Sequence, residues 1–177
     1  MEYFFPFRKL LREQLTFRKE ILKIANENIA KILSKFGNIS GYNITLVGVH
    51  IRRGYMVNMG DNGFNVASPE YLTRAVDYFK DRYQNIIFIV ASNGMSWAQR
   101  NMPSNISVEF IQNSAVVDMA TLATCNNTII TVGSFGWWSG WLAGREVTYF
   151  KWQDKPGSGY AKRINYKDYF YPGWIGL

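Results

Sequence analysis

The sequence predicts an α/β fold in which a parallel sheet carries helices on both of its faces. Short runs of β-branched and aromatic residues alternate with helical patterns along the chain, as in successive strand–helix–strand units. The strand-like runs are almost wholly apolar, which is typical of strands buried on both faces. The 177 residues, of which 47% are hydrophobic, are enough for one domain with a substantial core.

The first predicted element is an amphipathic helix over residues 16–36. Apolar side chains recur there at spacings of three and four and form one face, which consists of Phe17, Ile21, Ile24, Ala25, Ile29, Ile32, Leu33 and Phe36. Gly37 and Asn38 are expected to end the helix. Its lysines and arginines are typical of a solvated face.

Five strands follow this helix, and four further helices lie between them. The strand patterns cover residues 45–51, 85–91, 108–112, 128–133 and 146–150. Ser68 and Pro69 mark the start of the first of these helices, as an N-cap and a first-turn residue. The others are expected at 94–102, 115–125 and 134–143. The aromatic and basic tail, residues 151–177, has no clear period, and we expect it to wrap back over the domain.

Charge and composition exclude several classes of protein. The net charge is +7, but residues 36–143 carry six basic and six acidic side chains, so the basic excess lies at the two ends. A neutral middle disfavours a nucleic-acid-binding stripe, and no nucleic-acid partner is expected. One cysteine and one histidine supply neither a disulfide nor a zinc-like ligand set, so no metal or cofactor is expected. Cys125 fits an inert buried thiol.

Two sequence features concern the cellular compartment. No apolar run approaches the ~20 residues that span a bilayer, and the first residues carry an acid where a signal peptide would be basic. Four N-x-[ST] sequons are nevertheless present, at Asn38, Asn43, Asn105 and Asn126. This is a mild excess for the composition, and it indicates exposure to a lumenal compartment.

Three polar segments follow strands whose carboxyl ends meet at one edge of the predicted sheet. They are HIRRG (50–54), SNGM (92–95) and GSFGWW (133–138). A doubly wound parallel sheet binds its ligands beyond these carboxyl ends. We therefore expect the three segments to converge on one ligand.

The residue types in these segments suit a phosphate. Arg52 and Arg53 carry guanidinium groups, which bind phosphate oxygens in pairs and stay charged. The GSFG turn (133–136) lies between a strand and a helix, so its N–H groups and the helix dipole favour an anion. Together they predict a diphosphate clamp that needs no metal. The alternative is that the two arginines merely pair with surface carboxylates.

Four stretches of the sequence resemble the successive motifs of the galactoside α-1,2-fucosyltransferases. They are VGVHIRRG (47–54), IIFIVASNGMSWAQ (86–99), DMATLATCNNTIITVGSFGWWSGWLAG (118–144) and YFYPGW (169–174). Their order and spacing also match, and the resemblance extends to LREQLTFRKEI (11–21) near the start. It therefore covers essentially the whole chain.

The resemblance implies an inverting, metal-independent glycosyltransferase on the lumenal side of the Golgi membrane. Such an enzyme has two Rossmann-like domains in the GT-B arrangement and moves L-fucose from GDP-fucose to O2 of a terminal β-galactose. Its partners are thus GDP-fucose and a β-galactoside glycan. Residues 1–177 resemble the C-terminal, donor-binding domain, with 1–40 as a leading helical segment.

The resemblance also implies roles for single residues. Arg52 matches the catalytic ligand of the β-phosphate. Asp118 resembles an acid that faces the guanosine, where a carboxylate would accept hydrogen bonds from guanine; the alternative is a polar cap that opens a helix. The residues implied in donor binding are His50, Arg52, Arg53, Asn93, Asp118, Ser134, Phe135 and Gly136.

The chain departs from the family pattern in two ways. The pattern H-x-R-R-G-D-Y lacks its acid here, because Tyr55 directly follows Gly54, and Asp61 in the following loop is a candidate replacement. The N-terminal half, stem and membrane anchor of the family have no counterpart in this sequence, and acceptor choice is expected to depend on them. Two interpretations stay open: a fragment of a fucosyltransferase, or a relative that binds the nucleotide-sugar or glycan without transfer.

Overall fold

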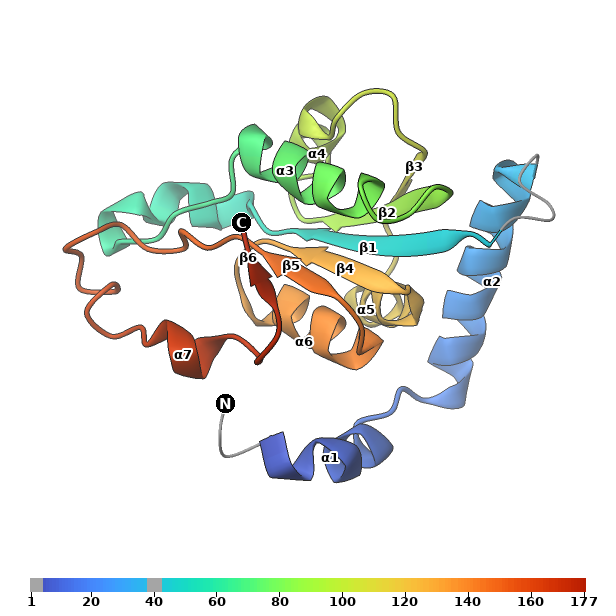
Figure 1. The fold of residues 1–177 in the computed structure, drawn as a ribbon, viewed down its shortest axis with the longest axis horizontal. Coiled ribbons are helices and arrows are strands. Elements are labelled where there is room, and N and C mark those ends of the chain that lie inside the picture. The colour runs from blue at the N-terminus through green and yellow to red at the C-terminus, as the bar shows by residue number, and fades with distance from the viewer. Residues whose placement is uncertain (1–4, 38–42) are drawn as a thin grey trace.

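The computed structural model describes residues 5–37 and 43–177, and its centre is a six-stranded sheet (Figure 1). The strands are β1 (Thr45–Ile51), β2 (Ile86–Ser92), β3 (Val108–Ile111), β4 (Asn127–Ile130), β5 (Val147–Tyr149) and β6 (Ile175–Gly176). Their order is β3-β2-β1-β4-β5-β6, and every neighbouring pair is parallel. The five predicted strands and the parallel sheet are confirmed.

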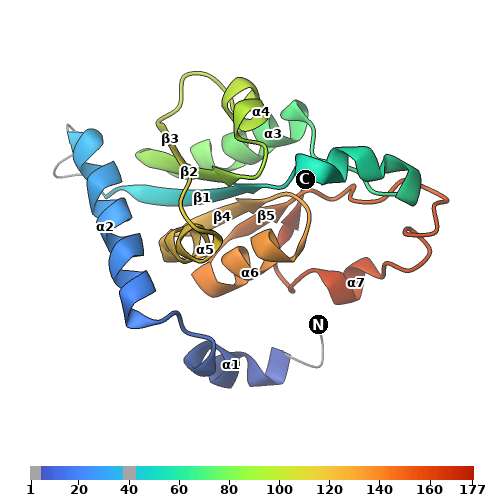
Figure 2. The same cartoon turned by 180° about the vertical axis from the view of Figure 1, so that it is seen from behind.

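Helices cover both faces of this sheet, as predicted. They are α1 (Arg8–Gln14), α2 (Lys19–Lys35), α3 (Pro69–Lys80), α4 (Met95–Asn101), α5 (Ala115–Thr124), α6 (Ser134–Ala143) and α7 (Tyr166–Tyr169), with 3-10 segments η1 (Phe5–Phe7) and η3 (Gly54–Asn62). Helices α3 and α4 lie on one face, and α5 and α6 lie on the other (Figures 1 and 2). Within residues 5–37 and 43–177, no helix is both long and apolar enough to cross a membrane.

The sheet separates two apolar clusters, because successive residues of a strand point to opposite faces. Val47, Val49 and Ile51 of β1 pack in the cluster beneath α3 and α4. Leu122 of α5 belongs to the cluster on the other face. A Cβ on Gly48 would lie only 3.2 Å from the Leu122 side chain and carbonyl oxygen, so this glycine lets α5 approach β1 closely.

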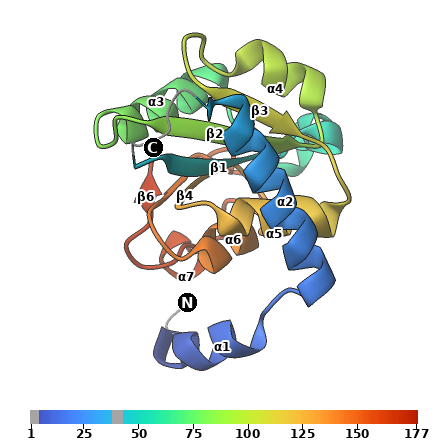
Figure 3. The same cartoon turned by 90° about the vertical axis from the view of Figure 1, so that its right-hand side faces the viewer.

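Helix α2 confirms the amphipathic helix predicted over residues 16–36, although it starts later, at Lys19. Ala25, Ile29 and Ile32 are buried, and α2 packs against α5. Ile24 is 41% exposed, so its predicted place on the buried face is wrong. Ile29 and Ile32 belong to the apolar cluster that contains Leu122, and Leu33 and Phe36 pack against it. Helix α2 lies at the amino ends of the strands (Figure 3), which leaves Ile24 outside this contact.

The tail, residues 151–177, wraps back over the domain as expected and also adds β6 beside β5. A two-residue strand is too short to leave a period in the sequence. Gln153 is buried, and its Nε2 donates a hydrogen bond to the Thr131 carbonyl at 3.2 Å. The backbone N–H of Lys151 donates to the Leu177 carbonyl at 3.3 Å. The first bond fixes the tail to the residue that follows β4, and the second joins the two ends of the tail.

Candidate functional site at the carboxyl ends of the strands

The three segments that follow β1, β2 and β4 meet at one edge of the sheet, as predicted. The backbone N–H of Arg52 donates to Thr131 Oγ1 at 2.8 Å, and that of Arg53 donates to Asn93 Oδ1 at 2.7 Å. Ser92 Oγ donates to the Ile51 carbonyl at 2.8 Å. Side chains from β2 and from the residues after β2 and β4 therefore hold the backbone on which both arginines stand.

The two guanidinium groups lie against aromatic rings. That of Arg52 lies 4.9 Å from the ring centre of Tyr55, and that of Arg53 lies 3.8 Å from Trp97. Arg53 also donates to the Ala67 carbonyl at 3.1 Å. Neither arginine pairs with a carboxylate in the described part of the chain. The alternative explanation, in which both arginines form surface ion pairs, is therefore not supported.

The GSFG turn lies beside Arg52. A Cβ on Gly133 would be 3.9 Å from Arg52 Cγ, and Gly133 has a φ of 89°, which favours glycine. Helix α6 begins at the next residue, Ser134, which is exposed. The N–H groups of the first turn and the Arg52 side chain can thus reach one anion from two sides.

His50 lies beneath this turn and not on its surface. Only 5% of it is exposed, and its ring stacks on Phe135 with 4.7 Å between the ring centres. A Cβ on Gly136 would lie 2.7 Å from His50 Nδ1, so glycine is needed for the imidazole to fit. Burial and, less strongly, the charge of Arg52 lower the pKa of His50 to about 3. The imidazole is therefore neutral and a very weak base.

Asn93 and Gly54 form the opposite wall of the site. Asn93 is exposed, and its side-chain oxygen accepts from Arg53 as described. Gly54 has a φ of 40°, and a Cβ there would collide with Asn93 Nδ2, so a larger residue would displace Asn93. Asp61, the candidate replacement for the family's acid, is exposed in η3, and no described contact joins it to either arginine.

Asp118 lies in the first turn of α5, where its carboxylate holds the preceding loop. It accepts hydrogen bonds from the Asn113 backbone N–H at 3.1 Å and from Asn113 Nδ2 at 2.9 Å. Asp118 does not open the helix as the capping alternative had it, because Ser114 is the N-cap, although its carboxylate holds the loop before the helix. A role toward guanosine stays a prediction. Cys125 follows α5 and is buried, and its burial raises the pKa of the thiol to about 12, as expected of an inert cysteine.

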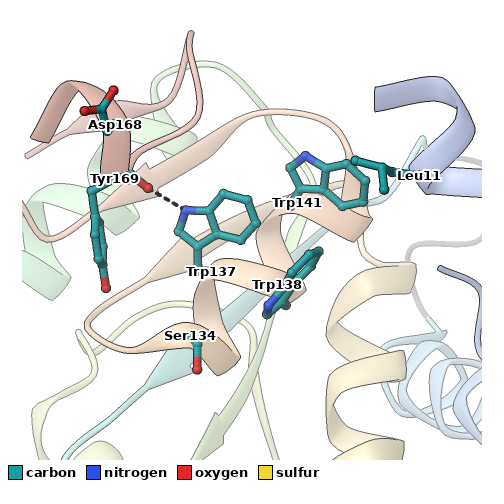
Figure 4. Close-up of a pocket in the computed structure, with 7 residues that line it drawn as sticks. All are labelled: Leu11, Ser134, Trp137, Trp138, Trp141, Asp168 and Tyr169. Atoms are coloured by element: carbon teal, nitrogen blue, oxygen red, sulfur yellow. Dashed lines mark hydrogen bonds between the residues drawn. The ribbon is translucent and has the colours of Figure 1, made fainter. Parts of the chain in front are cut away.

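An aromatic pocket lies on the outer side of α6, and the sequence did not predict it. It has a volume of about 360 Å³ and is lined by Leu11, Ser134, Trp137, Trp138, Trp141, Asp168 and Tyr169 (Figure 4). Trp137 Nε1 donates to the Tyr169 carbonyl at 2.9 Å. The available signal was the spacing of the three tryptophans along one helix. Their partners come from both ends of the chain, which no local pattern reveals.

The sequons differ in accessibility. Asn43 and Asn105 are exposed. Asn126 accepts a hydrogen bond from the Leu46 backbone N–H at 2.8 Å, and Thr128 of its sequon is buried. Asn38 lies outside the described residues. Glycosylation stays a prediction, and the geometry favours Asn43 and Asn105.

Comparison with known proteins places these observations in a family. A model of glycosyl transferase family 11 matches residues 1–177. Galactoside alpha-(1,2)-fucosyltransferase 2 of Sus scrofa is 40% identical over 140 residues, which cover 75% of this chain and 41% of that protein. Galactoside alpha-(1,2)-fucosyltransferase 1 of Oryctolagus cuniculus is 32% identical over 182 residues, which cover 99% of this chain and 48% of that protein.

The chain thus spans less than half the length of these two relatives. Among solved structures, a glycosyl transferase family 9 protein from Veillonella parvula DSM 2008 has a TM-score of 0.49 at 16% identity. That similarity covers 77% of this chain and 36% of the other. The family predicted from the motifs is confirmed by the family model, which matches from the first residue to the last. The chain belongs to glycosyl transferase family 11.

Proposed function

We propose that this chain is the donor-binding part of a galactoside α-1,2-fucosyltransferase. It binds GDP-fucose and takes part in transfer of L-fucose to O2 of a terminal β-galactose. The observation that carries the proposal is the position of Arg52 beside the GSFG turn, with Arg53 next to it in the chain and neither arginine paired with a carboxylate in the described ranges. The two relatives, both galactoside alpha-(1,2)-fucosyltransferases by name, support the choice of sugar and linkage.

The diphosphate would bind between the arginines and the start of α6. Arg52 is suited to the β-phosphate, because its side chain lies next to the turn that opens the helix. The Ser134 hydroxyl and the first backbone N–H groups of α6 would supply further donors. The charge and the fork of donors on each guanidinium suit phosphate oxygens better than a single ammonium would.

The reaction is a single displacement that inverts the anomeric carbon. The galactose O2 attacks C1 of fucose from the face opposite the diphosphate, the bond from C1 to the diphosphate oxygen breaks, and GDP leaves. Arg52 and the α6 turn would stabilise the negative charge that grows on the β-phosphate. The proton of the attacking hydroxyl needs an acceptor. His50 is unsuited to this role, because it is buried and its pKa is about 3.

No metal is needed in this proposal. In residues 5–37 and 43–177, no group of three or more histidine, cysteine, aspartate or glutamate side chains is placed to hold an ion. Two guanidinium groups would take over the charge neutralisation that a carboxylate-held Mg²⁺ provides in other transferases. Activity in the presence of EDTA is the corresponding expectation.

The proposed compartment is the Golgi lumen. The family resemblance implies it, and the exposed sequons at Asn43 and Asn105 agree with it. Enzymatic removal of N-glycans from protein made in a secretory host tests this part. A shift in mass that disappears in Asn43→Gln and Asn105→Gln variants is expected, and an unglycosylated secreted chain would contradict it.

The test of activity is a transfer assay with the purified chain, GDP-fucose, methyl β-galactoside and EDTA. The expected product is the disaccharide in which α-fucose is linked to O2, identified by NMR. Binding of GDP-fucose without any product would favour the second candidate, a non-catalytic nucleotide-sugar-binding relative. The absent acid after Gly54 is the observation that favours this candidate. A chain that neither binds nor transfers would overturn both.

A further inference from the structure

The aromatic pocket beside α6 is built from indoles that the fold holds in place. Trp137 is fixed by its hydrogen bond to Tyr169, and its ring lies 5.2 Å from that of Trp174. Trp141 is buried, and the guanidinium of Arg12 lies 4.7 Å from its ring centre while also donating to its carbonyl. Two walls of the pocket are therefore rigid before any ligand arrives.

The third indole is presented to solvent. Trp138 is 39% exposed, although its ring makes edge contacts with Trp137 and Trp141 at 5.2 and 5.6 Å. In Figure 4 its indole nitrogen and the hydroxyls of Ser134 and Tyr169 point to the same side of the Trp137 ring. Burial raises the pKa of Tyr169, so that hydroxyl stays protonated. The pocket thus combines apolar rings with a few donors along one side.

This combination suits a sugar ring. A pyranose has an apolar face of C–H groups that stacks on an indole, and hydroxyls at its rim that need hydrogen-bond partners. The volume of about 360 Å³ lies within the range of roughly 300–1,000 Å³ that is typical of small-molecule sites. Ser134 lines the pocket and is also the first residue of α6, at the turn beside Arg52, so the pocket and the proposed diphosphate site share this residue.

We propose that the aromatic pocket binds the β-galactoside acceptor by stacking the apolar face of galactose on Trp138. The inference rests on the proposed function, and it adds a specificity-determining residue. It places part of the acceptor recognition in this chain, whereas the sequence-based expectation placed acceptor choice in the N-terminal half of the family. In β-galactose the axial hydroxyl at C4 leaves the hydrogens of C3, C4 and C5 together on one face. In β-glucose the C4 hydrogen lies on the opposite face, which breaks up this surface. The pocket therefore prefers galactosides to glucosides.

Indole NMR signals test the proposal directly. The chain has six tryptophans, so a ¹⁵N-labelled sample gives six side-chain N–H signals. The signal that vanishes in Trp138→Phe is assigned to Trp138. Methyl β-galactoside, added with GDP present, is expected to shift this signal and to leave that of Trp152 unchanged. Trp152 is the internal control, because it is 59% exposed and lies outside the pocket.

A pair of variants completes the test. Trp138→Ala is expected to weaken galactoside binding by roughly tenfold, as loss of a stacking contact would. The matched Trp152→Ala variant should bind as the unaltered chain does. GDP binding, measured in the same samples, should stay unchanged in both variants, which also reports on folding.

Three outcomes would overturn the inference, and they are distinguishable from failure of the proposed function. These are no indole shift, a shift of Trp152 alone, or equal shifts with methyl β-glucoside. If any of them occurs while GDP still binds, the pocket is only a gap between helices and the donor site stands. If GDP does not bind either, the proposed function fails together with the inference.

Discussion

The cationic side chains at the two ends of the parallel strands differ in their partners. Near the amino ends, Lys35 forms a salt bridge with Glu109, and Arg82 donates to the Tyr78 carbonyl of the neighbouring helix at 2.8 Å. At the carboxyl ends, Arg52 and Arg53 have no acidic partner in the described part of the chain. Lys35 is thus paired with an acid, and Arg53, like Arg82, donates to a backbone carbonyl. The Arg52 side chain makes neither an ion pair nor a hydrogen bond within the described residues, so its charge is available for an anion from outside.

Stacking of an arginine on an aromatic ring does not distinguish the two ends of the strands. Arg82 lies 3.7 Å from the ring centre of Tyr78, and Arg53 lies 3.8 Å from that of Trp97, so the same stacking occurs at both ends. The difference lies in the backbone. The N–H groups of Arg52 and Arg53 are held by side chains that follow β4 and β2, the two strands on either side of β1. This arrangement fixes the direction of both arginines before a ligand binds, which is what a preorganised charge requires.

The largest effect is expected from removing one cation at the carboxyl end. Arg52→Ala should lower the rate of fucose transfer by ~10²- to 10³-fold, because one preorganised donor to the β-phosphate is lost. Arg82→Ala is the matched control, since it removes a similarly stacked arginine from the opposite end. Steady-state assays of both variants compare the two ends. Equal losses in the two would show that the carboxyl end has no special role.

A large effect of pH on stability is expected from His50. The unfolded imidazole gains a proton near pH 6.5, whereas the folded one does so only near pH 3. The stabilising contribution of the neutral, buried form is thus complete above about pH 6.5 and is lost as the pH falls toward 3. Between pH 6.5 and pH 4 the loss is roughly 3 kcal/mol.

Denaturant unfolding across this pH range measures the effect. The carboxylates contribute equally to the unaltered chain and to His50→Gln, so the difference between the two isolates the histidine. Parallel pH profiles would mean that the imidazole is not buried as described.

A smaller effect is expected from the hydroxyl that holds the Arg52 backbone. Thr131→Val keeps the shape of this buried side chain but removes the acceptor of the Arg52 N–H, at a cost of about 1–3 kcal/mol in the free energy of unfolding. GDP affinity should fall as well, because Arg52 is no longer held in place. Thr131→Ser retains the oxygen and should restore GDP affinity. If Val and Ser behave alike, Thr131 has no positioning role.

The smallest effect is expected at the amino end. Lys35→Met removes the ion pair with Glu109, in which the lysine side chain is 59% exposed. Exposed pairs are worth about 0–1 kcal/mol, so thermal unfolding should change little. GDP binding should not change at all. A loss of GDP affinity in this variant would break the comparison between the two ends.

Much of the fold was accessible from the sequence, because the long buried strands are continuous apolar runs and α3 has a clear start signal. Ser68 and Pro69 begin α3 as predicted, and α6 runs over the predicted residues 134–143. The meeting of the HIRRG segment with the GSFG turn could also be predicted, because a parallel sheet brings the carboxyl ends of its strands to one edge.

Other features depend on contacts between distant segments and could not be predicted. Strand β6 is defined only by its pairing with β5, and the aromatic pocket needs Leu11 and Tyr169 at the two ends of the chain. The exposure of Ile24 depends on where α2 lies beside the sheet. The position of His50 beneath the turn requires the stacking on Phe135, which no local pattern encodes.

The central claim is that the carboxyl end recognises the β-phosphate of a guanine nucleotide without a metal. Calorimetric titration of the chain with GDP and then with GMP, in EDTA and at moderate salt, tests it most directly. The account predicts that GDP binds more tightly than GMP, and that Arg52→Ala removes the difference while Arg82→Ala keeps it. Equal affinities for GDP and GMP in the folded chain, or no binding of either, would contradict the claim.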